Sequence, residues 1–587
     1  MKKLLLITLI FSFAISIYAQ EGGKKKFQIK KPNIQIKKPN LRIGEKLGDL
    51  AGNAMTGKTS LLSEAAPIAT MISGIYDPAT KTSEAKYFPK GTVEGDYLAG
   101  ITFMKSSGVG MLKIDGEVSC DGKQMEYVGL GSYMMRFDEP VLEAKTIKIT
   151  TETGEEAHFN IKPLQEIEII SVNGDITLPI IDLTEDLKIK FTASNSDDKS
   201  IIKVGLISDA AGARAVNWFA DFKTEGNEVT IPHQAFSNLE ISGALNTGNI
   251  NKGQTFLVIQ RELKVEKSAM DDQQNAEAFS SATSQAVSYA SKRVIVKGKQ
   301  ENGMITTLRF SGGHRKVLGY DVHKPNARKG IPFSRASKFG LLSLTINGKT
   351  YKKETESGSS SRTVGNTRYT STWTTTTTYE FPQLPNEYWD VAMDDFYKRM
   401  VQYFDDSMNV KFAPVEHVTQ APGYNTLFES VEINDETEIS RTYKDTKRAT
   451  PNSIREVFSN LSSSQSSETP SAYLMKIVNI DGLVTMDISF DIGANKAGKV
   501  VLLPTVKFSI TGMDETKQNR LGTYADGYIT YRQGIPFSAE LAKSDPNYLS
   551  SILNVDNIMS CMAYMLSNLK AKEVEMGYDA IWSIGEE

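Results

Sequence analysis

The chain has 587 residues, of which 40% are hydrophobic and 23% are charged, and its formal net charge is −3. At roughly 150 residues per domain this length predicts about four domains. The near-neutral charge balance excludes binding of nucleic acid or an anionic membrane through an overall positive charge. Beyond the N-terminus no apolar run approaches the ~18 residues of a spanning helix, so membrane association is expected to be peripheral if it occurs.

Residues 1–19 are predicted to be a secretory signal peptide. Lys2 and Lys3 precede an apolar run over residues 4–17, and Ala19 offers a cleavage site after a small residue. No cysteine stands at that site, so a lipoprotein anchor is not expected. We therefore expect an exported protein that is periplasmic, displayed on the cell surface or secreted.

Residues 20–50 are predicted to be a basic extended linker. The segment FQIKKPN is followed at once by its near copy IQIKKPN, and the prolines favour an extended or polyproline-like arm. Two interpretations stay open for this repeat. It is either a tether for an acidic envelope partner such as lipopolysaccharide or a solvated spacer.

Residues 51–90 are predicted to be a short helical or irregular segment, with a packing helix over residues 61–72. Within it, GNAMTGKT at residues 52–59 matches the phosphate-loop pattern letter for letter. The preceding IGEKLGDLA is charged and interrupted by glycine, and so it is not the buried strand that a phosphate loop follows. We therefore expect no nucleotide site here.

Two tandem antiparallel β-sandwiches are predicted over residues 91–163 and 164–265. The first contains an Asp121-Gly122 pair between alternating segments, which is typical of a two-residue hairpin turn. The second shows regular short strands separated by turn residues, a pattern typical of an immunoglobulin-like fold. Its aromatic residues are interpreted as a buried plug between sheets or, alternatively, as a ligand platform; they are Trp218, Phe219 and Phe222.

No catalytic residue, cofactor site or metal site is predicted. Glu156, His158 and Asn160 share one face of a predicted strand, but such a row is more typical of a solvated face than of a metal site. The five histidines are scattered and none has the HExxH spacing of a zinc site, and the sequence contains no GxSxG motif of a nucleophilic serine. Cys120 lies in a predicted core strand and Cys561 in a methionine-rich helix, so two buried free thiols are expected in place of a disulfide.

Residues 266–292 are predicted to be a helical connector, because small and apolar residues recur there at heptad-like spacing. A β segment is expected over residues 293–330. The remaining residues, 331–587, are predicted to form an α/β domain. Its central helix begins at Asn386 as N-cap and ends before Asn409, with one apolar stripe. The stripe contains Trp389, Met393, Phe396, Met400, Tyr403 and Phe404.

A Thr/Ser-rich insertion at residues 351–380 separates this helix from the apolar strand at residues 339–346. Residues 357–361 are expected to be flexible, and TSTWTTTTTYEF is expected to form a strand or a hairpin arm, since threonine is β-branched. Trp373 and Tyr379 are the candidates for an exposed contact surface. The alternatives are an arm folded on its own domain and an arm through which the protein self-assembles.

The C-terminal part resembles the periplasmic α/β domain shared by the TolB N-terminal domain and CsgG-type secretion lipoproteins. The resemblance lies in the order of FGLLSLTI, EYWDVAMDDFYKRMVQYF, VKFAPVEHV, SAYLMKIVNIDG and VVLLPTVKFSITG, of which SAYLMKIVNIDG is expected to begin a strand at residues 472–477. It implies an interaction platform in envelope assembly or transport. The chain departs from CsgG in lacking a lipidated cysteine and an evident pair of pore-forming hairpins, and no functional residue is carried over.

The sequence therefore predicts a multidomain protein, mainly β and then α+β. The first functional hypothesis is a secreted or periplasmic, non-enzymatic, envelope-associated binding or assembly module for protein or surface-glycan partners. The alternative is a hydrolase that acts on envelope polymers with carboxylates gathered from separate loops.

Overall fold

The computed structural model describes the chain from residue 56 to residue 586, apart from several internal stretches. The predicted signal peptide and basic linker lie outside the described residues. So do residues 453–461, for which the polar sequence predicts a short helix. The stretches left out are residues 75–87, 94, 107–109, 193–199, 211–212, 224–225, 240–254, 271–275, 280, 298–306, 328, 428–437, 445, 449–469, 496–497 and 515–519.

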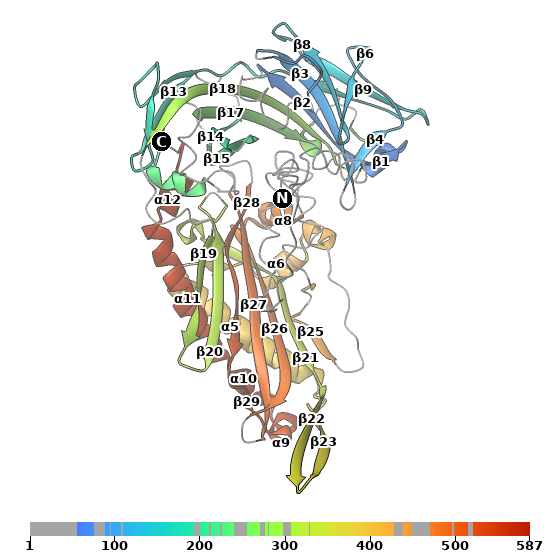
Figure 1. Ribbon diagram of the computed structural model, residues 1–587, viewed down its shortest axis with the longest axis vertical. Coiled ribbons are helices and arrows are strands. Elements are labelled where there is room, and N and C mark those ends of the chain that lie inside the picture. The colour runs from blue at the N-terminus through green and yellow to red at the C-terminus, as the bar shows by residue number, and fades with distance from the viewer. Residues whose placement is uncertain are drawn as a thin grey trace.

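The N-terminal half is organised around one long, curved sheet of eleven strands (Figure 1). Its central strand β18 pairs in parallel with β2 and antiparallel with β17. The main path is β1 (Thr56–Thr59), β4 (Met111–Ile114), β3 (Tyr97–Lys105), β2 (Ala65–Ser73), β18 (Thr283–Lys297), β17 (Thr255–Glu266), β14 (Ile201–Ala210) and β15 (Ala213–Phe222). Strands β7 (Glu126–Gly129), β8 (Ser132–Phe137) and β12 (Ile180–Asp182) pair beside it.

Two small antiparallel sheets pack on this long sheet. One contains β5 (Gly116–Cys120), β6 (Lys123–Gln124), β9 (Lys145–Thr151) and β10 (Glu156–Ile161); the other contains β11 (Ile169–Val172), β13 (Leu187–Phe191) and β16 (Glu228–Ile231). Phe103 of β3 shares a core with Phe159 of β10, whereas Phe219 of β15 shares a core with Phe191 of β13. The two predicted sandwiches therefore differ from the observed arrangement, because one continuous sheet crosses the expected boundary at residues 163–164.

Two helices predicted in this half are strands, and the predictions were wrong. The expected helix at residues 61–72 is mostly β2, which pairs with β3 and β18. Pro67 in its interior was a signal against a helix, since an interior proline costs about 3 kcal/mol. The expected connector at residues 266–292 contains the 3-10 turn Lys267–Ala269 and then β18. Pairing along both edges of β18 outweighs the helical spacing of its small residues.

The C-terminal half contains a nine-stranded mixed sheet. Strand β21 lies parallel to both β24 and β26, while the other long neighbours are antiparallel. The strands are β19 (Thr307–His314), β20 (Leu318–Pro325), β28 (Arg520–Tyr531), β27 (Val500–Asp514), β26 (Gly482–Ala494), β21 (Lys338–Lys349) and β24 (Lys411–Phe412), with β25 (Glu438–Thr442) and β29 (Ile535–Pro536) beside them.

Helices pack against this sheet in two groups. One group joins the main core and contains α5 (Asn386–Met408), α10 (Tyr548–Leu553), α11 (Val555–Glu575) and α12 (Tyr578–Trp582). The other forms a smaller core with Leu342, Leu483 and Met513 and contains α6 (Val415–Thr419) and α8 (Pro470–Val478). The short α9 (Ala539–Ser544) is capped by the Ser538 hydroxyl, which accepts a hydrogen bond from the Leu541 N–H. Among the described residues, no helix is long and apolar enough to cross a membrane.

The prediction of the central helix α5 is confirmed. All six residues of its predicted apolar stripe are buried, and Asn409 ends the helix in the left-handed conformation at φ 56°. Asn386 is the first helical residue and Pro385 occupies the cap position, so the predicted cap is wrong by one residue. The strand expected at residues 472–477 is also wrong, because this segment lies in α8. Burial of Ser471, Ala472, Leu474 and Met475 follows helical spacing.

Both cysteines are free and buried, as predicted. Burial raises the pKa of the Cys120 and Cys561 thiols to about 12. In the unfolded chain the thiols ionise from about pH 9, so stability is full below that pH and is lost as the pH rises toward 12.

We expect the urea midpoint to fall between pH 8 and pH 10, and to fall less in a variant with both cysteines replaced by alanine. Each protein is compared with itself at the two pH values, so any pH-independent loss of stability from the cavities that the replacements create cancels. An identical fall in both proteins would contradict this origin.

Candidate functional site

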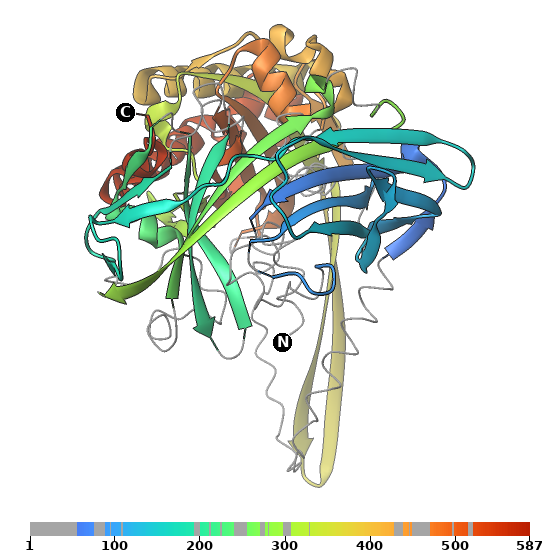
Figure 2. The ribbon, with the colours of Figure 1, turned by 90° about the horizontal axis from the view of Figure 1, so that it is seen from above.

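The most exposed element of the described chain is a two-stranded hairpin, here called the arm. It consists of β22 (Tyr351–Val364) and β23 (Thr367–Glu380), which pair without interruption from Tyr351↔Glu380 to Val364↔Thr367. Gly365 at φ 62° begins the two-residue turn at its tip. The insertion is therefore a hairpin along its full length, and the flexible segment expected at residues 357–361 is a strand. Figure 2 shows the arm extending well beyond the body of the molecule.

The base of the arm is held firmly against the C-terminal sheet. The Phe381 N–H donates to the Thr350 carbonyl at 2.8 Å. The Lys352 ammonium lies 2.9 Å from Glu354 and 3.4 Å from Asp491 of β26. The Tyr379 hydroxyl donates to Glu354 at 3.3 Å, and its side chain is only 9% exposed because it joins the main core. Tyr379 is thus a residue of the base, and its prediction as an exposed contact residue was wrong.

Trp373 lies farther out and remains 51% exposed. It stands opposite Gly358, where an added Cβ would come within 2.4 Å of the indole ring. The ring therefore covers the glycine across the strand pair, an arrangement that stabilises a glycine-containing strand. Tyr369, nearer the tip, is 62% exposed on the same face of β23. The arm thus presents two aromatic side chains to solvent from an ordered backbone.

The opposite face of the arm consists of hydroxyl-bearing side chains. Each cross-strand pair from Thr355↔Thr376 to Ser361↔Thr370 joins two threonines or serines on this face. The Thr355 and Thr376 hydroxyl oxygens lie 3.5 Å apart. The members are Thr355, Ser357, Ser359, Ser361, Thr370, Thr372, Thr374 and Thr376, all exposed. This face can form many hydrogen bonds and carries no charge in that region.

A groove of about 780 Å³ runs between α5 on one side and α10 with the start of α11 on the other. Its carboxylates are engaged in ion pairs: Asp394 lies 2.5 Å from Lys398, and Asp395 lies 2.9 Å from Arg399. The Lys398 ammonium holds the pKa of Asp394 below its usual value. A general acid needs a carboxyl whose pKa is raised, so Asp394 is unsuited to that role. The sequence did not indicate this groove because its walls come from segments far apart in the chain.

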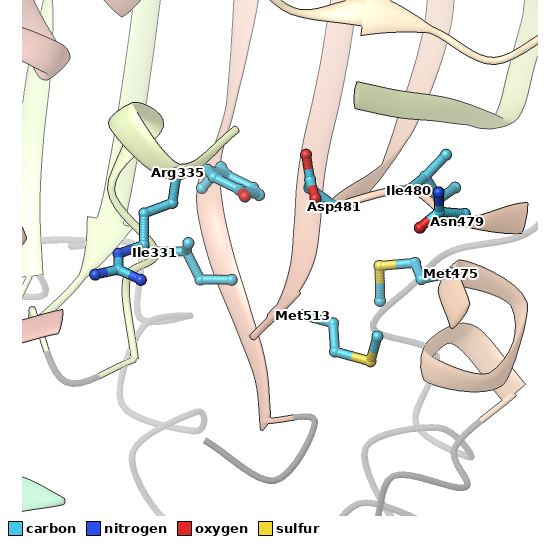
Figure 3. A pocket seen from close by; sticks show the side chains of 8 residues that line it. Ile331, Arg335, Met475, Asn479, Ile480, Asp481 and Met513 are labelled. Atoms are coloured by element: carbon cyan, nitrogen blue, oxygen red, sulfur yellow. The ribbon is translucent and has the colours of Figure 1, made fainter. Parts of the chain in front are cut away.

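A second, smaller pocket of about 240 Å³ is lined by residues that precede β21, by α8 and the turn after it, and by β27 and β28 (Figure 3). Its charged side chains have structural partners. Arg335 donates to Glu586 at 2.7 and 2.8 Å, and Asp481 accepts from the Ser337 N–H at 2.7 Å and the Lys338 N–H at 2.8 Å. Met475 and Met513 supply apolar surface. The arrangement serves to join strand β21 to its neighbours.

The other residues considered from the sequence do not assemble into a site. Lys58 of the phosphate-loop pattern lies in strand β1, 3.6 Å from Asp115. Glu156 lies 2.8 Å from Lys148, and Asn160 accepts a hydrogen bond from Thr146 at 2.8 Å. No group of three or more potential metal ligands occurs among the residues that the structure describes.

The aromatic residues of the second predicted sandwich form a plug between sheets, as expected. Phe219 and Phe222 are fully buried, and the Phe219 ring centroid lies 5.0 Å from that of Phe236. Trp218 is only half-buried and belongs to a separate small cluster. The interpretation as a plug is confirmed for the two phenylalanines.

No protein-family model and no curated protein matches this chain. Similar solved structures include fibronectin(III)-like modules of Clostridium thermocellum CbhA, at 13% identity over 35% of this chain and 90% of that chain, with a TM-score of 0.12. Murine CEACAM1b matches at 6% identity over 40% of this chain and 100% of its own, with a TM-score of 0.12. The Bacteroides ovatus glucan-utilisation protein SGBP-B, solved with a mixed-linkage heptasaccharide, matches at 11% identity over 56% and 87%, with a TM-score of 0.10. Such scores carry no argument about this chain.

Proposed function

We propose that this chain is a secreted or periplasmic, non-enzymatic, envelope-associated protein that acts as a binding or assembly module for protein or surface-glycan partners. The arm is its contact element. The observation that carries the proposal is the exposure of a long, ordered hairpin with solvent-facing Tyr369 and Trp373. A lone two-stranded hairpin is marginally stable in water, and so it gains from a surface that covers it.

The way in which the arm is attached supports this role. Its base continues directly from β21, and β21 pairs on one edge with β26 along most of its length. The Lys352 ion pairs and the buried Tyr379 fix the base against the same sheet. A contact element that is held by a rigid scaffold loses little freedom on binding, and this favours affinity.

The C-terminal unit also supports the proposal through its order of elements. Strand β21, the arm, helix α5, strand β24 and helix α6 come first, and β25 and α8 then precede the antiparallel strands β26, β27 and β28. This order agrees with the resemblance to periplasmic interaction domains, although α8 takes the place of one expected strand. In this interpretation the α/β unit is the platform and the arm is an elaboration of it.

Shortening the arm tests the proposal. We would remove residues 355–376 and join Glu354 to Thr377, which are paired, through a two-residue Asn-Gly turn. This design keeps Lys352, Glu354 and Tyr379 at the base. We expect the shortened protein to fold normally and to lose at least about tenfold of its recovery in crosslinked complexes from the envelope fraction of the native host, corresponding to about 1.4 kcal/mol of binding free energy.

The matched control is Tyr528→Ser, which removes a 42% exposed aromatic side chain from β28 on the body. We expect this variant to be recovered as the unchanged protein is. Equal recovery of the shortened and unchanged proteins would overturn the assignment of the arm as the contact element.

A further inference from the structure

The two edges of the arm differ sharply in charge. Strand β22 contains five charged residues: Lys352, Lys353, Glu354, Glu356 and Arg362. Strand β23 contains only Arg368, next to its first residue, and Glu380, its last. Between them lies an uncharged segment, YTSTWTTTTTY, without glycine or proline. Charged residues protect exposed strand edges from pairing, and the edge of β23 lacks that protection.

The outer edge of β23 is also unpaired. Within the described part of the chain, the arm is a two-stranded sheet and β23 pairs with β22 alone. A segment of high β propensity, little charge and no proline is the kind that pairs with an identical segment. Threonine pairs across strands through both its methyl group and its hydroxyl group. These properties favour another copy of β23 as the partner of this edge.

We infer that β23 pairs antiparallel with β23 of a second copy of this chain, with the two-fold axis at Thr374. This inference rests on the proposed role of the arm and names its partner. Arg368 and Glu380 are equally far from Thr374 in sequence, and all three residues lie on the hydroxyl-bearing face. The two-fold therefore places Arg368 of each copy directly opposite Glu380 of the other.

The pairs between these ends are uncharged on both faces of the new sheet. On the hydroxyl-bearing face, Thr370 lies opposite Thr378 of the second copy and Thr372 lies opposite Thr376. On the other face, Trp373 lies opposite Thr375, so the two Trp373 side chains are diagonal neighbours within reach of each other. A shift of two residues in either direction would separate both ion pairs. The charges thus specify one register, and an isologous two-fold contact closes on itself.

The assembled element is a four-stranded sheet, β22-β23-β23-β22, with the charged β22 strands at its outer edges. Four strands exceed the minimum of about three that an independently stable sheet needs, which two strands do not reach. The outer edges carry the charges that discourage further addition of strands. The arrangement therefore predicts a dimer and not a fibre.

The test is the oligomeric state of the purified mature chain, measured by sedimentation over a range of concentrations. We expect a dimer whose dissociation constant rises by about tenfold or more in R368E and in E380R, because each change replaces two attractive pairs by repulsive ones. The double variant R368E/E380R, which exchanges the charges, is expected to recover most of the loss. All positions are exposed, so the monomers should fold normally.

A cysteine test fixes the register. In T374C the two new thiols lie opposite each other, and mild oxidation should give a disulfide-linked dimer. In T372C the new thiol faces Thr376 of the second copy and should link far more slowly. The two native cysteines are buried and do not interfere.

Three results would overturn the inference: a monomer at all concentrations, unchanged dimerisation in the single reversals, or failure of the double variant to recover. A different outcome separates the two proposals. If the shortened protein is no longer recovered in crosslinked envelope complexes but the wild-type protein is a monomer, the inference of arm pairing is wrong and the proposed function still holds.

Discussion

Replacing Glu573 by glutamine is expected to destabilise the C-terminal unit by about 3–5 kcal/mol. Glu573 is 2% exposed and pairs with Lys324, which is fully buried. Its other carboxylate oxygen accepts the Phe333 N–H at 2.9 Å. Burial lowers the pKa of Lys324 well below its usual value, because taking the ammonium out of water disfavours its charged form. Glutamine removes the negative charge of the Glu573 carboxylate and leaves the Lys324 ammonium buried without an ion-pair partner at this position.

The pair joins elements that are distant in the chain. Lys324 belongs to β20 and Glu573 to the last turn of α11, and the ammonium lies 5.0 Å from the ring centroids of both Phe333 and Tyr578. Removing both charges at once, in K324M/E573L, should therefore cost much less than Glu573→Gln or K324M alone, because nothing charged remains buried. Urea unfolding of the three variants measures the differences.

The matched control is Lys572→Ala. Lys572 directly precedes Glu573 on the same helix, and the change breaks its exposed ion pair with Glu575. Exposed pairs contribute about 0–1 kcal/mol, so a small change is expected. An effect of Glu573→Gln no larger than that of the control would show that the buried pair does not hold α11 to β20.

Phe404→Ala is expected to cost about 3–5 kcal/mol, through lost apolar burial and the cavity that remains. Phe404 is fully buried on α5. Its ring centroid lies 5.8 Å from that of Phe339 in β21 and 5.5 Å from that of Phe412 in β24. It thus joins the helix to strands β21 and β24, which pair with each other in the sheet. The large volume removed cannot be refilled without moving one of these elements.

The control on the same helix is Lys398→Ala, at a position 71% exposed. Its effect should stay within about 0.5 kcal/mol, because it loses one exposed i,i+4 pair and no packing. Urea midpoints of the two variants give the comparison. Similar midpoints would contradict the central packing role of α5.

The parts of the fold that the sequence predicted well are those whose pattern is local. The stripe of α5 repeats over about four turns, and Asn409 adopts the positive φ that ends the helix. The run of threonines correctly predicted an extended strand in the arm, because β-branched residues favour extended backbone. In both cases the residues that determine the structure lie close together in sequence.

The errors have a common physical cause, which is pairing with distant segments. Strand β18 consists of small and polar residues whose helical spacing is outweighed by partners on both edges. The alternation of apolar and polar residues at 472–477 wrongly predicted a strand. Pro470 begins a helix there, and proline is common at the first helical position. The shared sheet of the two predicted sandwiches could not be foreseen, because β18 lies far in sequence from β2.

The candidate site was predicted in part. Trp373 is exposed as expected, whereas Tyr379 is buried although it lies on the same face of β23. Alternation assigns residues to faces but does not say where a hairpin leaves the body. That point depends on β26, whose Asp491 lies beside the Lys352 ammonium and is far away in the sequence.

Site-specific photo-crosslinking in the native host tests the arm most directly. A photoreactive phenylalanine analogue would replace Trp373 on the arm or, as the control, Tyr564, which is 47% exposed on α11. The account predicts abundant adducts from position 373 and few from position 564, with the adduct of two copies of this chain prominent among those from the arm. Equal and sparse adducts from both positions would contradict the arm as the contact element.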